Sequence, residues 1–211
     1  MPLHPRLWLL AQLALGGTYD KRRLVLKHYT NQRRVLEIGC AVGNVSMAFR
    51  RFNEVIFVGV DVDSHAIACA RSIFKNDPRF RFIAGTAQSL IGREEPFDLV
   101  LLAGVLHHVD NDTAAGLIGA AAQLLSSAGT LVISEPEPAR ASDSWLVRLY
   151  SRIERGLWLR GRDELIALAQ RSGQALTVSE SEETFISPFI FRWPNCVRFA
   201  VLKLRPTTSL T

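Results

Sequence analysis

The stretch Val35-Leu-Glu-Ile-Gly-Cys-Ala-Val-Gly-Asn44 decides the fold of this chain. Its beginning, within residues 34–38, is rich in aliphatic and β-branched side chains and predicts a short strand. Gly39 and Gly43 follow in a turn, and Asn44 is the expected N-cap of a helix that runs to about Phe52. Glycine permits positive φ and close approach of a ligand to the main chain. A strand entering such a turn and helix is typical of the ligand-binding edge of an open α/β sheet.

Strand and helix patterns then alternate. Val55 to Val60 is an almost unbroken apolar run, which predicts a strand buried on both faces, and Asp63 or Ser64 should cap a helix that ends near Lys75. Further strands are expected at 80–84, 97–102, 130–134, 175–184 and 196–204, and further helices at 113–125, 143–154 and 163–171. The alternation predicts right-handed βαβ units, and the last two strands, with no helix between them, predict an antiparallel pair. We therefore expect an α/β fold: a Rossmann-like seven-stranded sheet of five parallel strands plus a C-terminal antiparallel hairpin, with helices on both faces.

Length and composition suit one domain with its own core. The chain has 211 residues, 48% hydrophobic and 21% charged, which excludes disordered and fibrous proteins. The net charge of +5 permits an anionic partner without requiring one. Cys40, Cys69 and Cys196 are isolated in the sequence, so we expect neither a disulfide framework nor a metal site, and we expect a cytoplasmic protein.

The N-terminal segment has two interpretations. The apolar run from Leu7 to Leu15, followed by Gly16-Gly17, resembles a short signal peptide. We favour a first helix that the glycine pair ends, because Gln12 interrupts the apolar run.

A carboxylate stands at the tip of the second expected strand, in Val58-Gly-Val-Asp61. An acid there can accept hydrogen bonds from both hydroxyls of a ribose. The alternative role, a helix N-cap, is better filled by Asp63-Ser64. The glycine turn and Asp61 together indicate a cofactor that contains adenosine.

At this point the sequence resembles the class I S-adenosylmethionine-dependent methyltransferase family. The likeness covers roughly residues 20 to 204, and the order and spacing of its motifs make it specific. The matching segments are Glu37-Ile-Gly-Cys-Ala-Val-Gly-Asn44, Val58-Gly-Val-Asp-Val-Asp63, Phe80-Arg-Phe-Ile-Ala-Gly-Thr-Ala87, Phe97-Asp-Leu-Val-Leu-Leu-Ala-Gly-Val-Leu-His-His108, Gly129-Thr-Leu-Val-Ile-Ser-Glu-Pro136 and Asp163-Glu-Leu-Ile-Ala-Leu-Ala-Gln-Arg-Ser-Gly173.

The resemblance implies S-adenosyl-L-methionine as cofactor, S-adenosyl-L-homocysteine as product, and a role for each matching residue. Glu37 would orient the glycine turn and reach the cofactor amino group. The methionine part would lie against Gly39, Cys40, Ala41, Gly43, Ala103 and Gly104. Asp61 would hold the ribose, and the adenine would contact Val62, Thr86, Ala87 and Gln88.

Two positions depart from the family pattern. Ala41 replaces a glycine that is common in the first motif, a change that is tolerable if φ is negative there. Thr86 replaces an acid that often faces the adenine amino group, although its hydroxyl can still accept a hydrogen bond.

The resemblance also divides the chain. It implies one methyltransferase domain with an N-terminal helical cap at 1–30, a cofactor-binding half at 31–136, substrate-side helices and the hairpin at 137–205, and a tail at 206–211. A nicotinamide dehydrogenase is a weaker alternative, because Gly39-x-x-x-Gly43 is not G-x-G-x-x-G. A cofactor-binding scaffold that no longer methylates is a second alternative.

Methyl transfer is an in-line displacement that needs the acceptor atom about 3 to 3.5 Å from the methyl carbon. An oxygen or carbon acceptor usually also needs a base. His107 and His108 are candidate catalytic bases, and at most one should face the site if the chain is extended there. Glu135 and Glu137 either line the acceptor pocket or are solvated loop carboxylates.

The acceptor is expected to be a small molecule. Ala103-Gly-Val-Leu-His107 stands where many DNA methyltransferases carry Asp/Asn-Pro-Pro-aromatic, which disfavours nucleic acid. The basic residues are interpreted as solvated helix faces; they are Lys21, Arg22, Arg23, Arg148, Arg152, Arg155, Arg160 and Arg162.

An aromatic segment, residues 185–193, contains Phe185, Phe189, Phe191 and Trp193. It predicts an apolar acceptor pocket, a peripheral membrane contact, a homodimer contact or ordinary core. If it is functional, a lipid-, quinone- or polyketide-like acceptor fits best.

Overall fold

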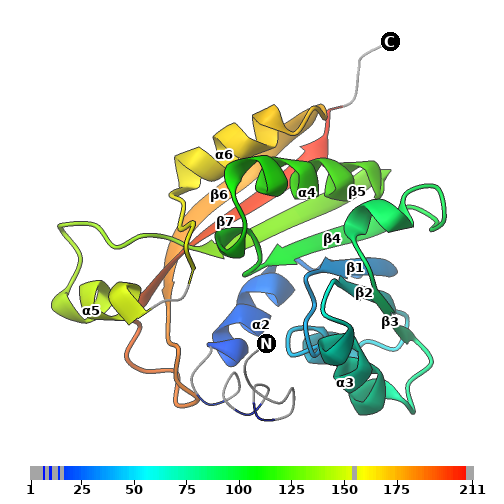
Figure 1. The fold of residues 1–211 in the computed structure, drawn as a ribbon, viewed down its shortest axis with the longest axis horizontal. Helices are drawn as coiled ribbons and strands as arrows, with labels where there is room; N and C mark the ends of the chain where they lie inside the picture. Colours follow the sequence, from blue (N-terminus) through cyan, green and yellow to red (C-terminus); the bar gives the residue numbers. More distant parts are fainter. Residues whose placement is uncertain (1–6, 8–9, 11–13, 15–16, 154–155, 208–211) are drawn as a thin grey trace.

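The computed structural model describes residues 7, 10, 14, 17–153 and 156–207. Its centre is a seven-stranded sheet in the order β3-β2-β1-β4-β5-β7-β6 (Figure 1). The strands are β1 Arg34–Ile38, β2 Ile56–Asp61, β3 Phe80–Ala84, β4 Phe97–Ala103, β5 Leu125–Pro136, β6 Leu176–Ile186 and β7 Val197–Pro206. Strands β1 to β5 pair in parallel, and β7 is antiparallel to both β5 and β6. The predicted fold class is confirmed.

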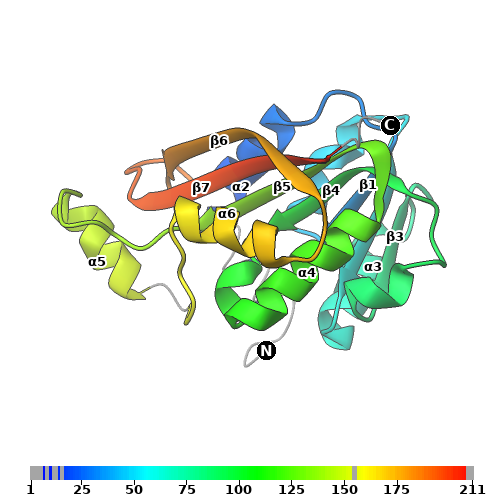
Figure 2. The same cartoon turned by 90° about the horizontal axis from the view of Figure 1, so that it is seen from above.

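Helices cover both faces of this sheet (Figure 2). The α-helices are α2 Thr18–Lys27, α3 Ser64–Phe74, α4 Asn111–Gln123, α5 Trp145–Ile153 and α6 Arg162–Arg171. Three short 3-10 helices are η1 Ser46–Arg51, η2 Ala87–Leu90 and η3 Leu106–His108. The predicted helix over residues 7–15 falls largely on residues outside the described ones.

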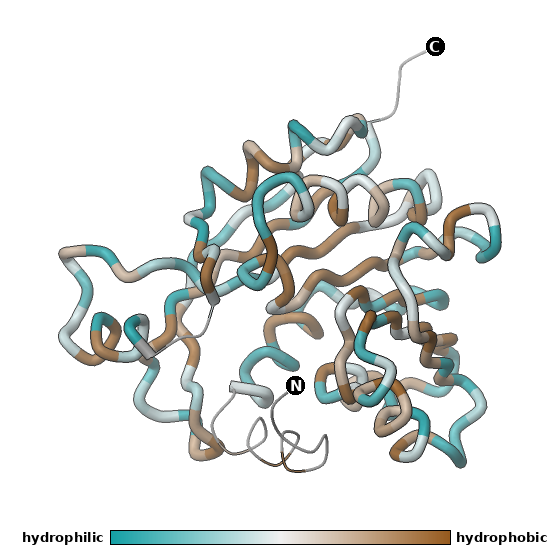
Figure 3. The backbone as a smooth tube through the Cα atoms, viewed as in Figure 1, coloured by the Kyte–Doolittle hydropathy of each residue, from teal (hydrophilic) through white to brown (hydrophobic). Residues whose placement is uncertain are grey.

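Alternation along the central strands builds two separate hydrophobic cores. Leu36 and Leu102 point to the side covered by α4 and α6, whereas Val35 and Leu101 point to the side covered by α2, η1 and α3. The central strands are hydrophobic along nearly their whole length (Figure 3). This two-sided burial explains the unbroken apolar runs, and it fixes the strand ends that form the site.

One local prediction is wrong. Asn44 does not cap an α-helix that reaches Phe52; residues 41–45 form turns, and the helix that follows is the short η1. The side-chain amide of Asn44 instead donates to the Thr18 hydroxyl at 3.4 Å. Burial of Val42 and Val45 holds the turn residues against the core and delays the helix. The Asp63 cap of α3 is confirmed, since its carboxylate accepts from the amides of His65 and Ala66.

No helix in the described part of the chain is long and apolar enough to cross a membrane.

Candidate active site

The turn after β1 needs glycine at two positions. Gly39 and Gly43 have φ of 75° and 78°, in the left-handed region. A Cβ added at Gly39 would lie 2.5 Å from the side chain of Val105, and one at Gly43 would lie 2.9 Å from the ring of Phe74. The turn is thus packed closely between the loop after β4 and helix α3.

The expectation that alanine is tolerated at position 41 because φ is negative there is wrong. Its φ is 46°, so the condition of a negative φ is not met. A side chain in the left-handed region costs about 1–2 kcal/mol, because Cβ approaches the following carbonyl oxygen. The substitution of glycine by alanine therefore stores strain in the turn.

Asp61 fastens this turn to the tip of β2. One carboxylate oxygen accepts from the amide of Ala41 at 2.8 Å, and the other accepts from the amide of Asp63 at 2.9 Å. A carboxylate offers about four acceptor positions, so both oxygens retain capacity for ligand hydroxyls. Val62, next to Asp61, is 75% exposed, a surface available to a flat apolar ring.

Glu37 lies buried beneath the same turn. Its carboxyl accepts a hydrogen bond from the Ser46 hydroxyl, and desolvation by burial is the main reason that its pKa rises to about 8, with the nearby Asp61 charge adding to the effect. Arg22 of α2 and the Ser46 bond oppose this rise. Burial also raises the pKa of the neighbouring Cys40 thiol.

The loop after β3 presents two polar side chains. Thr86 and Gln88 are exposed, whereas Ala87 is buried at the start of η2. Thr86 makes no side-chain capping bond to η2. These positions are compatible with the predicted contact to an adenine edge.

The end of β4 faces a cation and an imidazole. A Cβ built on Gly104 would lie 3.7 Å from both Lys21 Nζ and His107 Cε1, and Ala103 beside it is half-buried. Sequence analysis missed Lys21, which it assigned to a solvated helix face. The available signal was the basic triplet Lys21-Arg22-Arg23, which lies in α2, the helix before the first strand.

His107 and Glu135 form a buried pair. The His107 Nδ1 and a Glu135 carboxylate oxygen are 2.7 Å apart, and the pair is almost completely enclosed. Glu135 also accepts from the backbone amides of Val105 at 2.7 Å and Leu106 at 2.9 Å. Burial pushes the pKa of Glu135 upward, but the His107 bond and these amides outweigh it and leave the pKa below its ordinary value. Glu135 is therefore an ionised carboxylate that holds one edge of the imidazole.

Two sequence expectations about this region need correction. The two histidines are not in extended chain but in η3, with ring centroids 3.9 Å apart; His107 is buried and His108 is exposed. Glu135 and Glu137 are not solvated, since both are nearly fully buried. Strand β5 continues through Pro136, which carries Glu135 into the interior.

Arg160 is a further correction, because it is buried rather than on a solvated face. Its guanidinium donates to the carbonyl oxygens of Leu106 and Val109 at 2.6 and 2.7 Å and to Asn111 at 2.8 Å. It therefore fixes both ends of η3 and with them the backbone of His107.

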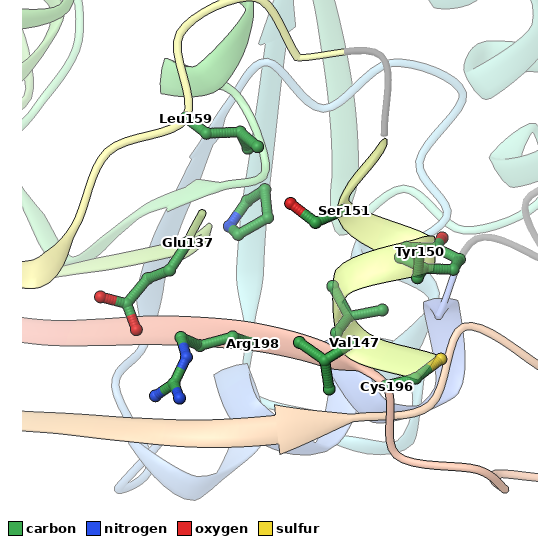
Figure 4. A pocket seen from close by; sticks show the side chains of 9 residues that line it. Glu137, Val147, Tyr150, Ser151, Leu159, Cys196 and Arg198 are labelled. Atoms are coloured by element: carbon green, nitrogen blue, oxygen red, sulfur yellow. The ribbon is translucent and has the colours of Figure 1, made fainter. Parts of the chain in front are cut away.

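A crevice lies between α5, the end of β5 and the start of β7 (Figure 4). It is narrow: its cavity volume is about 10 Å³, room for about one water molecule. Its lining residues are Pro136, Glu137, Val147, Tyr150, Ser151, Leu159, Cys196, Val197 and Arg198. Pro136 follows Glu135 directly, and Trp158, just before Leu159, donates its amide to the His107 carbonyl at 3.1 Å. Two backbone segments, residues 135–136 and 158–159, thus connect the residues around His107 with the lining of the crevice.

Glu137 gives the crevice a buried polar group. One of its oxygens accepts from the amide of Arg162 at 2.8 Å, and the other has no hydrogen-bond partner within the described part of the chain. Desolvation raises the pKa of this carboxyl. Leaving a buried oxygen unpaired is costly, so the site favours a ligand that brings a donor.

The aromatic segment divides into two pairs. Phe189 packs against the core. Phe185 lies under the guanidinium of Arg198, whose Cζ is 4.7 Å from the centroid of the phenyl ring. Phe191 and Trp193, in contrast, are 89% and 77% exposed. The core interpretation thus fits Phe189, whereas Phe185, at 39% exposed, and the outer pair are available for a surface contact.

Comparison with known proteins gives one family match. Residues 35–129, a segment that runs from β1 into β5, match the family model for a methyltransferase domain. A comparison with curated protein sequences gives no match.

Solved structures of methyltransferases share the fold of this chain. The Burkholderia thailandensis 1,6-didemethyltoxoflavin-N1-methyltransferase, crystallised with its namesake compound and S-adenosylhomocysteine, is 21% identical with a TM-score of 0.67, over 92% of this chain and 80% of that one. A TehB-like methyltransferase from Corynebacterium glutamicum is 19% identical with a TM-score of 0.62, over 89% and 87%. The mitomycin 7-O-methyltransferase is 18% identical with a TM-score of 0.69, over 90% of this chain but 54% of its own.

The strain at Ala41 predicts a stabilising substitution. Ala41→Gly should raise the free energy of unfolding by about 0.5–1 kcal/mol, because relief of the left-handed conformation exceeds the entropy that glycine adds to the unfolded chain. Urea denaturation measures the change. Ala66→Gly in α3 is the control, and it should destabilise the protein by a similar amount. Destabilisation by Ala41→Gly would contradict the strain.

The raised pKa of Glu37 predicts a pH dependence of stability. The folded-state pKa of about 8 lies above the ordinary value of 4.5, so the native state binds the extra proton. The stabilisation is complete below the ordinary value and is lost as pH rises toward 8. Urea denaturation from pH 5 to 8 should show the free energy of unfolding falling more steeply in the wild-type protein than in Glu37→Gln. Parallel curves for the two proteins would refute the raised pKa.

Proposed function

We propose that the protein transfers the methyl group of S-adenosylmethionine to a small, largely apolar acceptor, lipid-, quinone- or polyketide-like, bound in the crevice beneath α5. The observation that carries this proposal is the buried His107–Glu135 pair, whose imidazole lies next to Gly104 at the end of β4. A crevice with mostly apolar walls begins at Pro136, the residue after Glu135. The similar structures support a small acceptor, since they include the mitomycin 7-O-methyltransferase and the 1,6-didemethyltoxoflavin-N1-methyltransferase. The aliphatic walls of the crevice favour an apolar body, and Glu137 favours a hydroxyl or amino group on it.

The residues at the strand ends suit the cofactor. We assign the ribose to Asp61, the adenine to the exposed side chain of Val62 and the loop of Thr86 to Gln88, and the methionine part to the turn between Gly39 and Gly43. Close approach to that turn is possible because both glycines lack a side chain. Lys21 would contribute a positive charge near Gly104 for the cofactor carboxylate, and the buried Glu37 carboxyl would contribute an acceptor oxygen for the cofactor amino group.

When bound, the cofactor supplies an electrophilic methyl group on a sulfonium. The acceptor must lose a proton as it is methylated, and His107 is the residue that we assign to receive it. Glu135 accepts from the Nδ1–H, which leaves Nε2 as the basic nitrogen of the ring. The ionised Glu135 stabilises the imidazolium that forms, and Arg160 keeps η3 in place throughout. His108 is assigned no part in proton transfer, because its side chain is exposed.

Replacement of His107 tests this assignment. A panel of phenolic, quinol and long-chain hydroxy acceptors, with tritiated S-adenosylmethionine, first identifies a substrate. His107→Gln should then lower kcat by about 10²- to 10⁴-fold, the usual contribution of a general base, with little change in cofactor affinity. His65→Gln, on the exposed surface of α3, is the matched control and should retain full turnover. A His107→Gln enzyme with at least half of the wild-type kcat would refute the base.

A further inference from the structure

Exposed apolar side chains gather at one end of the molecule. Trp145 and Leu149 lie on the outer side of α5, 65% and 49% exposed. Phe191 and Trp193 project from the connection between β6 and β7. In both views of the fold, α5 and this connection lie at the same end, away from α3 and β3 (Figures 1 and 2). We call the four side chains, together with Arg148 and Arg152, the α5 surface.

Helical geometry places charge and apolar area side by side on α5. Trp145 and Leu149 are four residues apart, as are Arg148 and Arg152, so the two pairs form adjacent rows on the exposed side of the helix. Val147 lies on the opposite side, buried in the core and lining the crevice. One helix thus separates the proposed acceptor crevice from the surrounding medium.

Helix α5 itself is positively charged. It contains two exposed arginines, Arg148 and Arg152, and no acidic residue. The acidic residue Asp143, just before α5, is engaged with Arg198. A helix with tryptophan and leucine beside arginine fits the boundary between lipid headgroups and acyl chains.

We propose that the α5 surface docks on an anionic phospholipid bilayer. The inference rests on the proposed function, because an apolar acceptor dissolved in the bilayer would then reach the crevice past α5. Charge complementarity selects this partner. In a two-fold symmetric dimer the same surface would meet itself, and the arginines of one copy would approach those of the other. An anionic bilayer instead attracts the arginines and accepts the apolar side chains.

Vesicle co-sedimentation tests the docking without any methyl acceptor. The full chain should bind vesicles of phosphatidylcholine with 30% phosphatidylglycerol and bind pure phosphatidylcholine at least tenfold more weakly. Arg148→Gln/Arg152→Gln should weaken the partition by about fivefold for each charge removed, the effect expected of a basic residue at an anionic surface. Lys75→Gln/Arg93→Gln removes two exposed charges near β3 and should bind as the wild type does.

Tryptophan fluorescence supplies the second measurement. Brominated acyl chains should quench the emission of the wild-type protein, and Trp145→Ala/Trp193→Ala should abolish most of that quenching. Both positions are exposed, so the variant should keep its thermal stability. Binding that ignores lipid charge, or survives both double substitutions, would overturn the proposal. A dimer in solution that Trp145→Ala/Trp193→Ala dissociates would also overturn the proposal, because the α5 surface would then be a contact between two copies of the chain. Calorimetry with S-adenosylhomocysteine, run in parallel, shows separately whether cofactor binding and hence the proposed function has failed.

Discussion

Carboxylates from neighbouring strands hold the two loops that form the site. Asp61, at the tip of β2, accepts from the amide of Ala41 in the loop after β1. Glu135, at the end of β5, accepts from the amides of Val105 and Leu106 in the loop after β4. Loops at the carboxyl ends of parallel strands leave amides that the sheet does not pair. Each carboxylate supplies the missing acceptor, so loop geometry is set by strand register rather than by the loop alone.

The same arrangement links stability to chemistry. Because Glu135 is held by backbone amides, it stays ionised in the interior and can orient His107 without a solvent shell. Arg160 satisfies the carbonyl oxygens of the same segment from the opposite direction, across the loop between α5 and α6. The imidazole of His107 is thus positioned both by β5 and by the loop between α5 and α6. A change in that loop would therefore reach His107 through Arg160.

Much of this protein could be predicted from its sequence, and the failures have physical causes. Strands β1 and β3 were predicted to the residue, because each is a short run of mainly aliphatic and aromatic residues that a turn follows. Asp61 was predicted to hold a ribose because Asp63 fills the cap position, but its bond to Ala41 depends on the pairing of β1 with β2. Burial of Arg160 and the pairing of His107 with Glu135 also escaped local patterns. These contacts join residues 54 and 28 positions apart, and only the folded chain brings them together.

The central claim is that the Asp61 carboxylate binds the ribose of the cofactor. Isothermal titration calorimetry tests it directly, because it measures the dissociation constant of S-adenosylhomocysteine. The wild-type protein should bind with one site per chain. Asp61→Asn keeps the side-chain size but replaces one acceptor oxygen by a donor amide, and it should weaken binding by at least tenfold while the protein stays folded. Wild-type protein that does not bind the nucleoside, or an Asp61→Asn variant that binds as tightly, would contradict the account.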